Sequence, residues 1–507
     1  MKKNMSRMLS LLLAVILLLP AAVACGKSEK EESVATTTAA VVADGNDTEA
    51  TSATEVEAEP AEPADDELLL DLTQRYDGEK LNMMIRQEYV TEFMAENVTG
   101  DIINDTSYNR DLKISEDLGI TINYIPVAQG SKNETYNNTI RNDVLSASKE
   151  FDVTASYAYY TTALSTEGLF YNWQDVKNVD LTRVWWGSRS GMADQLTING
   201  KLYLISGDAS FLYTQKAFAV FFNKTLLENN NIVKSDDLYQ LVHDGKWTLD
   251  KLIEYSSSLS ADLDGNGTYD GSDQYGLVTY LKTSVDNFFP CFGVNIVTRD
   301  DQGNYNVAIN NEHTVAVTDK LNQLFYSDNR TYLVGSKGDS VKAFTGNHAA
   351  FTLGGLEWYP SFKDMESDYG VLPYPKFDEN QKNYSTSVSD PYSLFGILNT
   401  CDKIDMVGAA MELYGYYNYT ELTPAYYEIV LKGKSARDSE SFAMLDIVHD
   451  SISFDLGFFY SGALGNPAQM FRTLLKDSTS ANFASYWESK GPALEANVKA
   501  LIEAFNK

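Results

Sequence analysis

The segment Lys80-Leu81-Asn82-Met83-Met84-Ile85 is a predicted short strand that opens the folded part of the chain. A second strand is predicted at residues 120–124 (ITINY) and a third at residues 151–155 (FDVTA). A helical stretch precedes each of these two strands, and the second stretch covers about residues 135–149. Strands that alternate with helices indicate βαβ units and a sheet covered by helices. The sequence therefore predicts an α/β fold.

Polar and aromatic residues directly follow the first and third of these strands. They are residues 86–89 (RQEY) and residues 156–160 (SYAYY). Ligands of such sheets bind at the carboxyl ends of the strands, so both loops are predicted to share one mouth.

The middle of the chain carries one strong strand and one clear helix start. Residues 217–222 (AFAVFF) form the predicted strand, and Asn223 and Lys224 make the turn after it. Thr248 is a predicted N-cap for a helix that begins at Leu249. Trp247 and the pair Trp185-Trp186 are predicted to be packing residues.

Several weak motifs occur in an order that resembles one known family. They are Gly200-Lys201-Leu202-Tyr203, the strand at 217–222, Asn223-Lys224, Trp247-Thr248, the stretch 344–355 (FTGNHAAFTLGG), the stretch 369–376 (YGVLPYPK) and the stretch 431–441 (LKGKSARDSES). This order resembles the extracellular solute-binding proteins of carbohydrate ABC importers, the maltodextrin-binding-like class. The resemblance covers the chain from about Lys80 to its end, and it is the order of the motifs that carries it.

The resemblance implies a class II, two-lobed "Venus flytrap" fold over residues 68–507, in which neither lobe is continuous in sequence. Lobe one would hold about residues 75–215 and a later return segment. Lobe two would hold about residues 220–385 and C-terminal helices. The chain would cross several times between the lobes, and the cleft between them would bind a carbohydrate.

Carbohydrate binding needs aromatic faces for the apolar side of a sugar ring and planar polar groups for its hydroxyls. The resemblance places a ligand-stacking tryptophan at Trp358, after Gly354-Gly355, one position later than the family pattern. The predicted ligand-binding residues are Arg86, Glu88, Tyr157, Tyr159, Asp208 and Trp358. For any one of them, a core or surface role is an equally good interpretation.

Residues 262–273 (DLDGNGTYDGSD) have the spacing of a Ca²⁺-binding EF-hand loop, with Asp273 at the position of the usual glutamate and Gly267 at the sharp turn. The predicted ligand residues are Asp262, Asp264, Asn266, Thr268, Asp270 and Asp273. A structural Ca²⁺ site is the preferred interpretation, and an Asx-rich turn without metal is the alternative.

Composition excludes some functions. The net charge of −31 argues against nucleic-acid binding, which needs basic patches. The motifs of zinc proteases, serine hydrolases and P-loop proteins are absent, and the four histidines are scattered, so we expect no catalytic cofactor and no enzyme. Cys291 and Cys401 are expected to be free thiols, although they could pair in an oxidising compartment.

The N-terminus predicts export. Residues 1–24 combine basic residues, a short apolar run and small residues before a cut site, which is the pattern of a secretory signal. Cys25 follows directly and resembles the lipidated cysteine of bacterial lipoproteins, although Ala22 stands where that motif usually has Leu. An ordinary secretory signal with an incidental cysteine is the alternative. Residues 25–67 form a predicted acidic tether with a mean reach of about 35 Å.

These predictions combine into one expected function. The protein would be a monomeric, lipid-anchored binding protein on the outer face of the cell membrane. It would capture an oligosaccharide and deliver it to the transmembrane subunits of an ABC permease. The alternatives are a secreted glycoside-active enzyme and a receptor that reports ligand to a membrane sensor.

Overall fold

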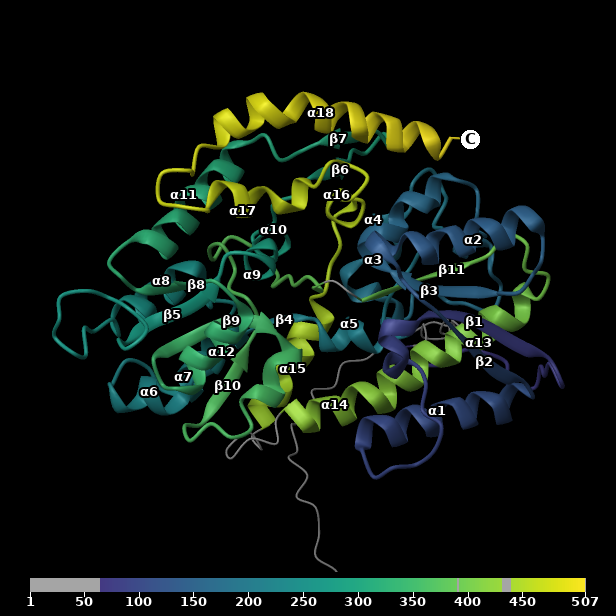
Figure 1. Ribbon diagram of the computed structural model, residues 1–507, viewed down its shortest axis with the longest axis horizontal. Coiled ribbons are helices and arrows are strands. Elements are labelled where there is room, and N and C mark those ends of the chain that lie inside the picture. The colour runs from purple at the N-terminus through teal and green to yellow at the C-terminus, as the bar shows by residue number, and fades with distance from the viewer. Residues whose placement is uncertain (1–63, 390–391, 431–438, 507) are drawn as a thin grey trace, which may run out of the picture. The chain divides into compact units, whose positions relative to one another are not determined.

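The computed structural model describes residues 64–389, 392–430 and 439–506 (Figure 1). The signal peptide, Cys25, nearly all of the tether and residues 431–438 lie outside these ranges. Within them, no helix combines the length and the apolar character needed to cross a membrane.

The first sheet forms lobe one and has the strand order β11-β3-β1-β2. Its parallel strands are β1 (Lys80–Arg86), β2 (Thr121–Val127) and β3 (Val153–Tyr157), which confirms the three predicted strands. β11 (Ser393–Ile397) pairs antiparallel with β3. The helices of this lobe include α1 (Ile102–Leu118), α2 (Glu134–Ser146), α3 (Ala158–Thr161), α4 (Met192–Leu196), α5 (Phe211–Gln215) and α13 (Ile404–Tyr417).

The second sheet forms lobe two and has the order β10-β4-β9-β5-β8. Its strands are β4 (Phe218–Asn223), β5 (Tyr275–Tyr280), β8 (Thr331–Val334), β9 (Ala349–Gly355) and β10 (Tyr369–Leu372). Every residue of β4 and β9 is buried, so both central strands are covered on both faces. The helices of this lobe include α6 (Lys224–Asn229), α7 (Ser235–His243), α8 (Leu249–Ser257), α9 (Thr283–Asp286), α10 (Phe288–Cys291), α11 (Glu312–Tyr326) and α12 (Lys337–Thr345).

The chain passes between the two sheets three times. It leaves lobe one between α5 and β4, and it returns between β10 and β11, because β11 joins the first sheet after every strand of the second. It leaves again between α13, which packs on β1, and α15 (Ser439–Asp450), which packs on β10. The stretches around Ala217, residues 386–388 and Ile452, called the crossing segments below, lie side by side, since Ala217 pairs with Val388 and Thr386 pairs with Ile452, which follows α15. Both lobes are therefore discontinuous in sequence, as predicted.

The C-terminal part of the chain follows the last crossing. It contains α16 (Leu456–Phe459), the short helix η9 (Pro467–Gln469), α17 (Met470–Leu474) and α18 (Phe483–Ala504), and α18 runs along the top of the view in Figure 1. The small hairpin of β6 (Val297–Arg299) and β7 (Tyr305–Val307) contacts α18.

Buried tryptophans confirm three packing predictions. Trp185, Trp186 and Trp247 are fully buried, and the indole N–H of Trp247 donates to the carbonyl of Pro373 at 2.9 Å. The predicted cap at Thr248 is wrong in its mechanism. The helix begins at Leu249 as predicted, but the Thr248 side chain makes no cap hydrogen bond, and the N–H of Leu249 donates to the carbonyl of Lys376.

The two cysteines of the folded part are free thiols, of which Cys291 is buried and Cys401 is half-buried.

The chain already contacts the body before residue 68. The carbonyl of Asp65 accepts a hydrogen bond from the Val184 N–H at 3.0 Å, and its carboxylate pairs with Arg189 at 2.9 Å.

Candidate ligand-binding site

Arg86 lies at the end of β1 and is fully buried. Its Nη2 donates to Oε2 of Glu92 at 3.1 Å and to the Ser393 hydroxyl at 2.9 Å. Burial raises the pKa of Glu92, and the Arg86 guanidinium opposes this shift. The guanidinium also lies over two rings, 4.3 Å from the centroid of Tyr89 and 5.6 Å from that of Tyr157. Arg86 thus positions the aromatic side chains of the mouth through a buried ion pair.

Three tyrosines form a cluster at the end of β3. The ring centroids of Tyr157 and Tyr160 are 5.2 Å apart, and those of Tyr159 and Tyr160 are 4.9 Å apart. All three side chains are half-buried, so part of their aromatic surface is accessible. The hydroxyl of Tyr159 donates to Oδ1 of Asn466, which follows α16. The structure therefore brings the predicted residues Arg86, Tyr157 and Tyr159 together.

Trp358 follows β9 in the other lobe and is only 2% exposed. Its ring lies against Gly354, where an added Cβ would be 2.4 Å from Cδ2 of the indole. The side chain of Glu357 folds back in the same way, because a Cβ at Gly355 would lie 1.9 Å from its Oε2. The two glycines thus leave room for two side chains that turn back onto the strand end.

Two lysines share the carboxylate of Glu357. Oε1 of Glu357 lies 3.3 Å from Nζ of Lys337 and 3.7 Å from Nζ of Lys216. Nζ of Lys337 also lies 5.2 Å from the ring centroid of Trp358. Lys216 directly follows α5 of lobe one, so the strand end that carries Trp358 is contacted from both lobes, and none of these partners is another predicted ligand residue.

Asp208 and Glu88 have partners other than the predicted ligand residues. Asp208 is 1% exposed, and its Oδ1 lies 2.9 Å from Nε2 of His449. Glu88 is exposed, and its carboxylate accepts the backbone N–H of Gln129 at 3.0 Å.

A small cavity of about 60 Å³ lies between the two sheets at the crossing segments. Tyr159 is the one predicted ligand residue that lines it. Sequence reasoning missed its charged pair, in which Nε of Arg472 donates to the two oxygens of Asp286 at 2.8 and 3.0 Å. No motif signals that pair, because its members are 186 positions apart. Residues that line the cavity are Ala158, Tyr159, Phe218, Thr283, Asp286, Val388, Ser389, Tyr392, Phe458, Phe459, Ser461, Ala468, Gln469 and Arg472.

A larger cavity of about 1030 Å³ contains none of the predicted ligand residues. It is lined by other stretches of the same crossing segments, including residues 381–385 and residues 453–456. Size alone therefore does not identify the binding site, and the aromatic cluster at the strand ends is the better candidate.

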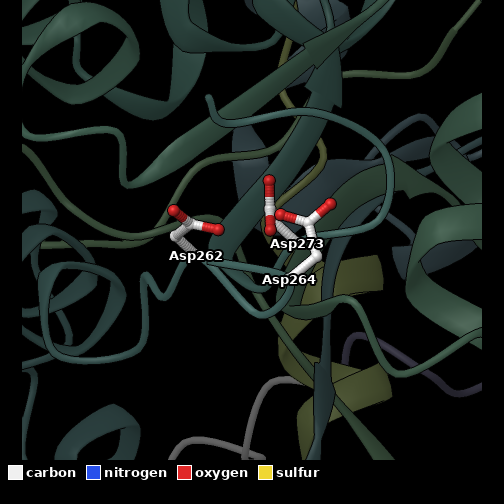
Figure 2. Close-up of side chains that lie close together, drawn as sticks. All are labelled: Asp262, Asp264 and Asp273. Carbon is white, nitrogen blue, oxygen red and sulfur yellow. The ribbon is translucent and has the colours of Figure 1, made fainter. Parts of the chain in front are cut away.

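The predicted metal loop brings three carboxylates together, from Asp262, Asp264 and Asp273, with oxygen atoms within 4.8 Å of one another (Figure 2). Asp273 is fully buried and Asp264 is exposed. Hard oxygen ligands at such spacing fit a Ca²⁺ ion. Two of the other three predicted ligands stabilise local turns: Oδ1 of Asn266 accepts the Thr268 N–H at 2.6 Å, and Oδ1 of Asp270 accepts the Ser272 N–H at 2.9 Å.

Comparison with known proteins identifies the family. Residues 112–437 match the sequence profile described as bacterial extracellular solute-binding protein, which is more than half of the 507 residues. The chain therefore belongs to the bacterial extracellular solute-binding protein family. No curated protein matches the chain significantly.

Solved structures show the same fold at low sequence identity. A cyclo/maltodextrin-binding protein complexed with maltotetraose is 15% identical with a TM-score of 0.52, and the match covers 84% of this chain and 96% of that one. UspC of M. tuberculosis is 16% identical with a TM-score of 0.51, and the match covers 82% of this chain and all of that one. These matches confirm the predicted two-lobed α/β fold.

Proposed function

We propose that this protein is the extracytoplasmic, lipid-anchored binding component of an ABC importer, and that it takes a carbohydrate between its lobes. The observation that carries the proposal is the half-buried tyrosine cluster of Tyr157, Tyr159 and Tyr160, placed at strand ends beside the interlobe cavity. Aromatic faces next to a charged hydrogen-bonding pair, here Arg472 and Asp286, suit the two sides of a sugar ring. The fold shared with a maltodextrin-binding protein supports the same ligand class.

Ligand entry requires the lobes to separate. The interlobe cavity holds about 60 Å³, whereas ligand pockets usually hold about 300 Å³ or more. An open form would therefore admit the sugar, and contacts from both lobes would favour the closed form. A shift from about 1:99 to 99:1 in favour of closure needs about 5.5 kcal/mol of preferential binding, which a few stacked rings and hydroxyl hydrogen bonds can supply. The closed form would then deliver the sugar to the permease subunits.

A thermal-shift screen against a glycan library tests the ligand class. We expect at least one oligosaccharide to raise the melting temperature, and Tyr159→Ala to remove that shift. Tyr255→Ala is the matched control, because Tyr255 is also half-buried but lies on α8, outside the interlobe cavity. If peptides or polyols stabilise the protein and no sugar does, the ligand class is wrong.

Binding without chemical conversion distinguishes the proposal from a glycoside-active enzyme. Incubation with labelled oligosaccharides should return them intact, and release of shorter products would contradict the transport proposal. A permease gene beside this one would favour transport over a sensor.

We also propose that the loop of residues 262–273 binds a structural Ca²⁺ ion through Asp262, Asp264 and Asp273. The three carboxylates make no ion pair with a basic side chain within the described ranges, so a cation would relieve their mutual repulsion. The ion would hold the loop between α8 and β5 and would take no part in ligand binding.

A further inference from the structure

A third cavity, of about 310 Å³, lies between η9 and the C-terminal helix α18. Its walls combine two aromatic side chains, Tyr486 and Trp487, with the amides of Asn466, Gln469 and Asn497. Its volume reaches the lower end of the range of ligand pockets, about 300 Å³.

Trp487 differs from the other five tryptophans of the chain. Those five are at most 2% exposed and pack in the core, whereas Trp487 is half-buried and lines this cavity. Its ring lies on the backbone of Gly491, one helical turn later, where an added Cβ would be 2.6 Å from Cε2. Because Gly491 has no Cβ, the indole of Trp487 can pack directly on the helix backbone at the cavity wall. Indole rings in such positions stack on the apolar face of a ligand.

The amides give the cavity hydrogen-bonding groups. Nδ2 of Asn497 donates to the carbonyl of Leu464 at 3.2 Å, which leaves its Oδ1 as an acceptor. The side-chain amide of Gln469 has no protein partner in the part of the chain that the structure describes. An amide can both donate to and accept from a hydroxyl, so these side chains suit a polyhydroxylated ligand.

Two residues connect this cavity with the candidate site. Gln469 lines both the third cavity and the interlobe cavity. Asn466 lines the third cavity, and its Oδ1 accepts the hydroxyl of Tyr159, which lines the interlobe cavity. Gln469 is therefore a wall that the two cavities share.

We infer that the cavity at η9 and α18 is an additional carbohydrate subsite, in which the indole of Trp487 stacks on a terminal sugar ring of a long oligosaccharide. The inference rests on the proposed function, because the remaining sugar rings would occupy the interlobe cleft. The subsite makes this protein selective for chain length: longer oligosaccharides reach both cavities, and a disaccharide reaches the cleft alone.

Isothermal titration with two ladders of neutral probes tests this inference. The probes are malto-oligosaccharides and cello-oligosaccharides from the disaccharide to the heptasaccharide. In the ladder that binds, we expect Trp487→Ala to weaken the longest members by about 3- to 10-fold, which is the scale of one aromatic stack, and to leave the disaccharide unchanged. Trp487→Phe keeps an aromatic face and should restore most of the lost affinity.

A second measurement does not depend on the truncated variant. Acrylamide should quench mainly the half-buried Trp487, and a long oligosaccharide should protect it while the disaccharide should not. Gln469→Ala, which keeps the indole, should also weaken long probes selectively.

The outcomes separate the two proposals. If wild type binds neither ladder, a subsite for these oligosaccharides is overturned, and the glycan screen decides the carbohydrate function separately. If wild type binds sugars but Trp487→Ala and Gln469→Ala change no affinity, or change all lengths equally, the subsite is overturned and the proposed function stands.

Discussion

Nε2 of His449 lies 2.9 Å from Oδ1 of Asp208, and both side chains are buried. Asp208 belongs to lobe one, where its N–H donates to the carbonyl of Trp185. His449 lies near the C-terminal end of α15, which packs on β10 of lobe two. A buried ion pair therefore joins the two lobes beside the crossing segments. On its outer side, Arg189 bridges Asp450 and Asp65.

Stability should depend on pH through His449. Burial lowers its pKa, but the carboxylates of Asp208 and Asp450 outweigh burial and raise the pKa to about 10. An unfolded histidine has a pKa of about 6.5, so the stabilisation is complete below that pH and is lost as the pH rises towards 10. Urea unfolding between pH 6 and pH 10 should show a falling free energy of unfolding. A flat profile would contradict this assignment.

Asp208→Asn provides the matched variant. It removes the nearer of the two carboxylates that contact His449 and leaves Asp450, whose Oδ1 lies 3.2 Å from Nδ1, so it should cost about 1.5–3 kcal/mol of stability near neutral pH. Asp250→Asn is the control, because Asp250 pairs with Lys320 but its side chain is 67% exposed. Exposed pairs contribute little, so that variant should unfold almost as wild type does.

The pair also explains which features the sequence could predict. The strands β1, β3 and β4 are short apolar runs whose signal is local, so the pattern predicted them and the α/β fold. The partner of Asp208 is 241 positions away, and no local pattern reports such a contact. From the sequence alone, Asp208 was predicted as a ligand residue, because nothing near it in the chain indicates that His449 is its partner.

Trp358 and Trp487 show the same difference between a local sequence signal and a contact that only the fold creates. Gly354-Gly355 before Trp358 was a usable signal, since close packing at a strand end needs residues without Cβ. Trp487 gave none, because its position within an ordinary helical sequence does not reveal a cavity that Leu464 and Asn497 complete. The packing of the Trp487 ring on Gly491 follows from their i, i+4 spacing only once the helix is known.

Gly354→Ala should displace the ring of Trp358. The new Cβ would lie 2.4 Å from Cδ2 of the indole, so the ring or the strand must move, at a cost of about 1–3 kcal/mol. Gly335→Ala is the control, because a Cβ added there would have no atom within 4 Å. Thermal unfolding of both variants measures the difference. Equal melting temperatures would show that the strand end adapts without cost.

Trp358→Ala should lower stability strongly, because it removes a ring that is only 2% exposed. Loss of a buried aromatic side chain costs about 3–5 kcal/mol. Urea denaturation measures that loss, and a loss below about 1 kcal/mol would contradict a core role for Trp358. Trp358→Ala would change stability and sugar affinity together. Trp358→Phe keeps much of the packing, so it is the variant for sugar titrations.

Calcium should stabilise the fold through the loop at residues 262–273. An ion that binds only the folded protein raises the melting temperature, so CaCl₂ should raise it by a few degrees and EGTA should reverse the change. Asp264→Asn should abolish the response; its side chain is exposed, and an Asn Oδ1 can still accept the Asn266 N–H. Asp300→Asn is the control, because Asp300 caps a similar turn outside the cluster. If neither CaCl₂ nor EGTA changes the melting temperature, the proposed Ca²⁺ site is wrong.

Cys25→Ala should release the protein into the medium. The predicted tether runs to residue 67, although Asp65 is already bound by Arg189 and Val184, and the lipid at Cys25 would hold the body within about 35 Å of the membrane on average. Without the lipid, that tether has no long apolar run and no aromatic residue to keep it at the surface, and its acidic composition repels anionic lipids. Fractionation of cells and medium measures the change. Cys401→Ala is the control, because that thiol is part of the folded body and should leave the protein cell-bound. A Cys25→Ala protein that stays with the membrane would refute the lipid anchor and leave the solute-binding fold unaffected.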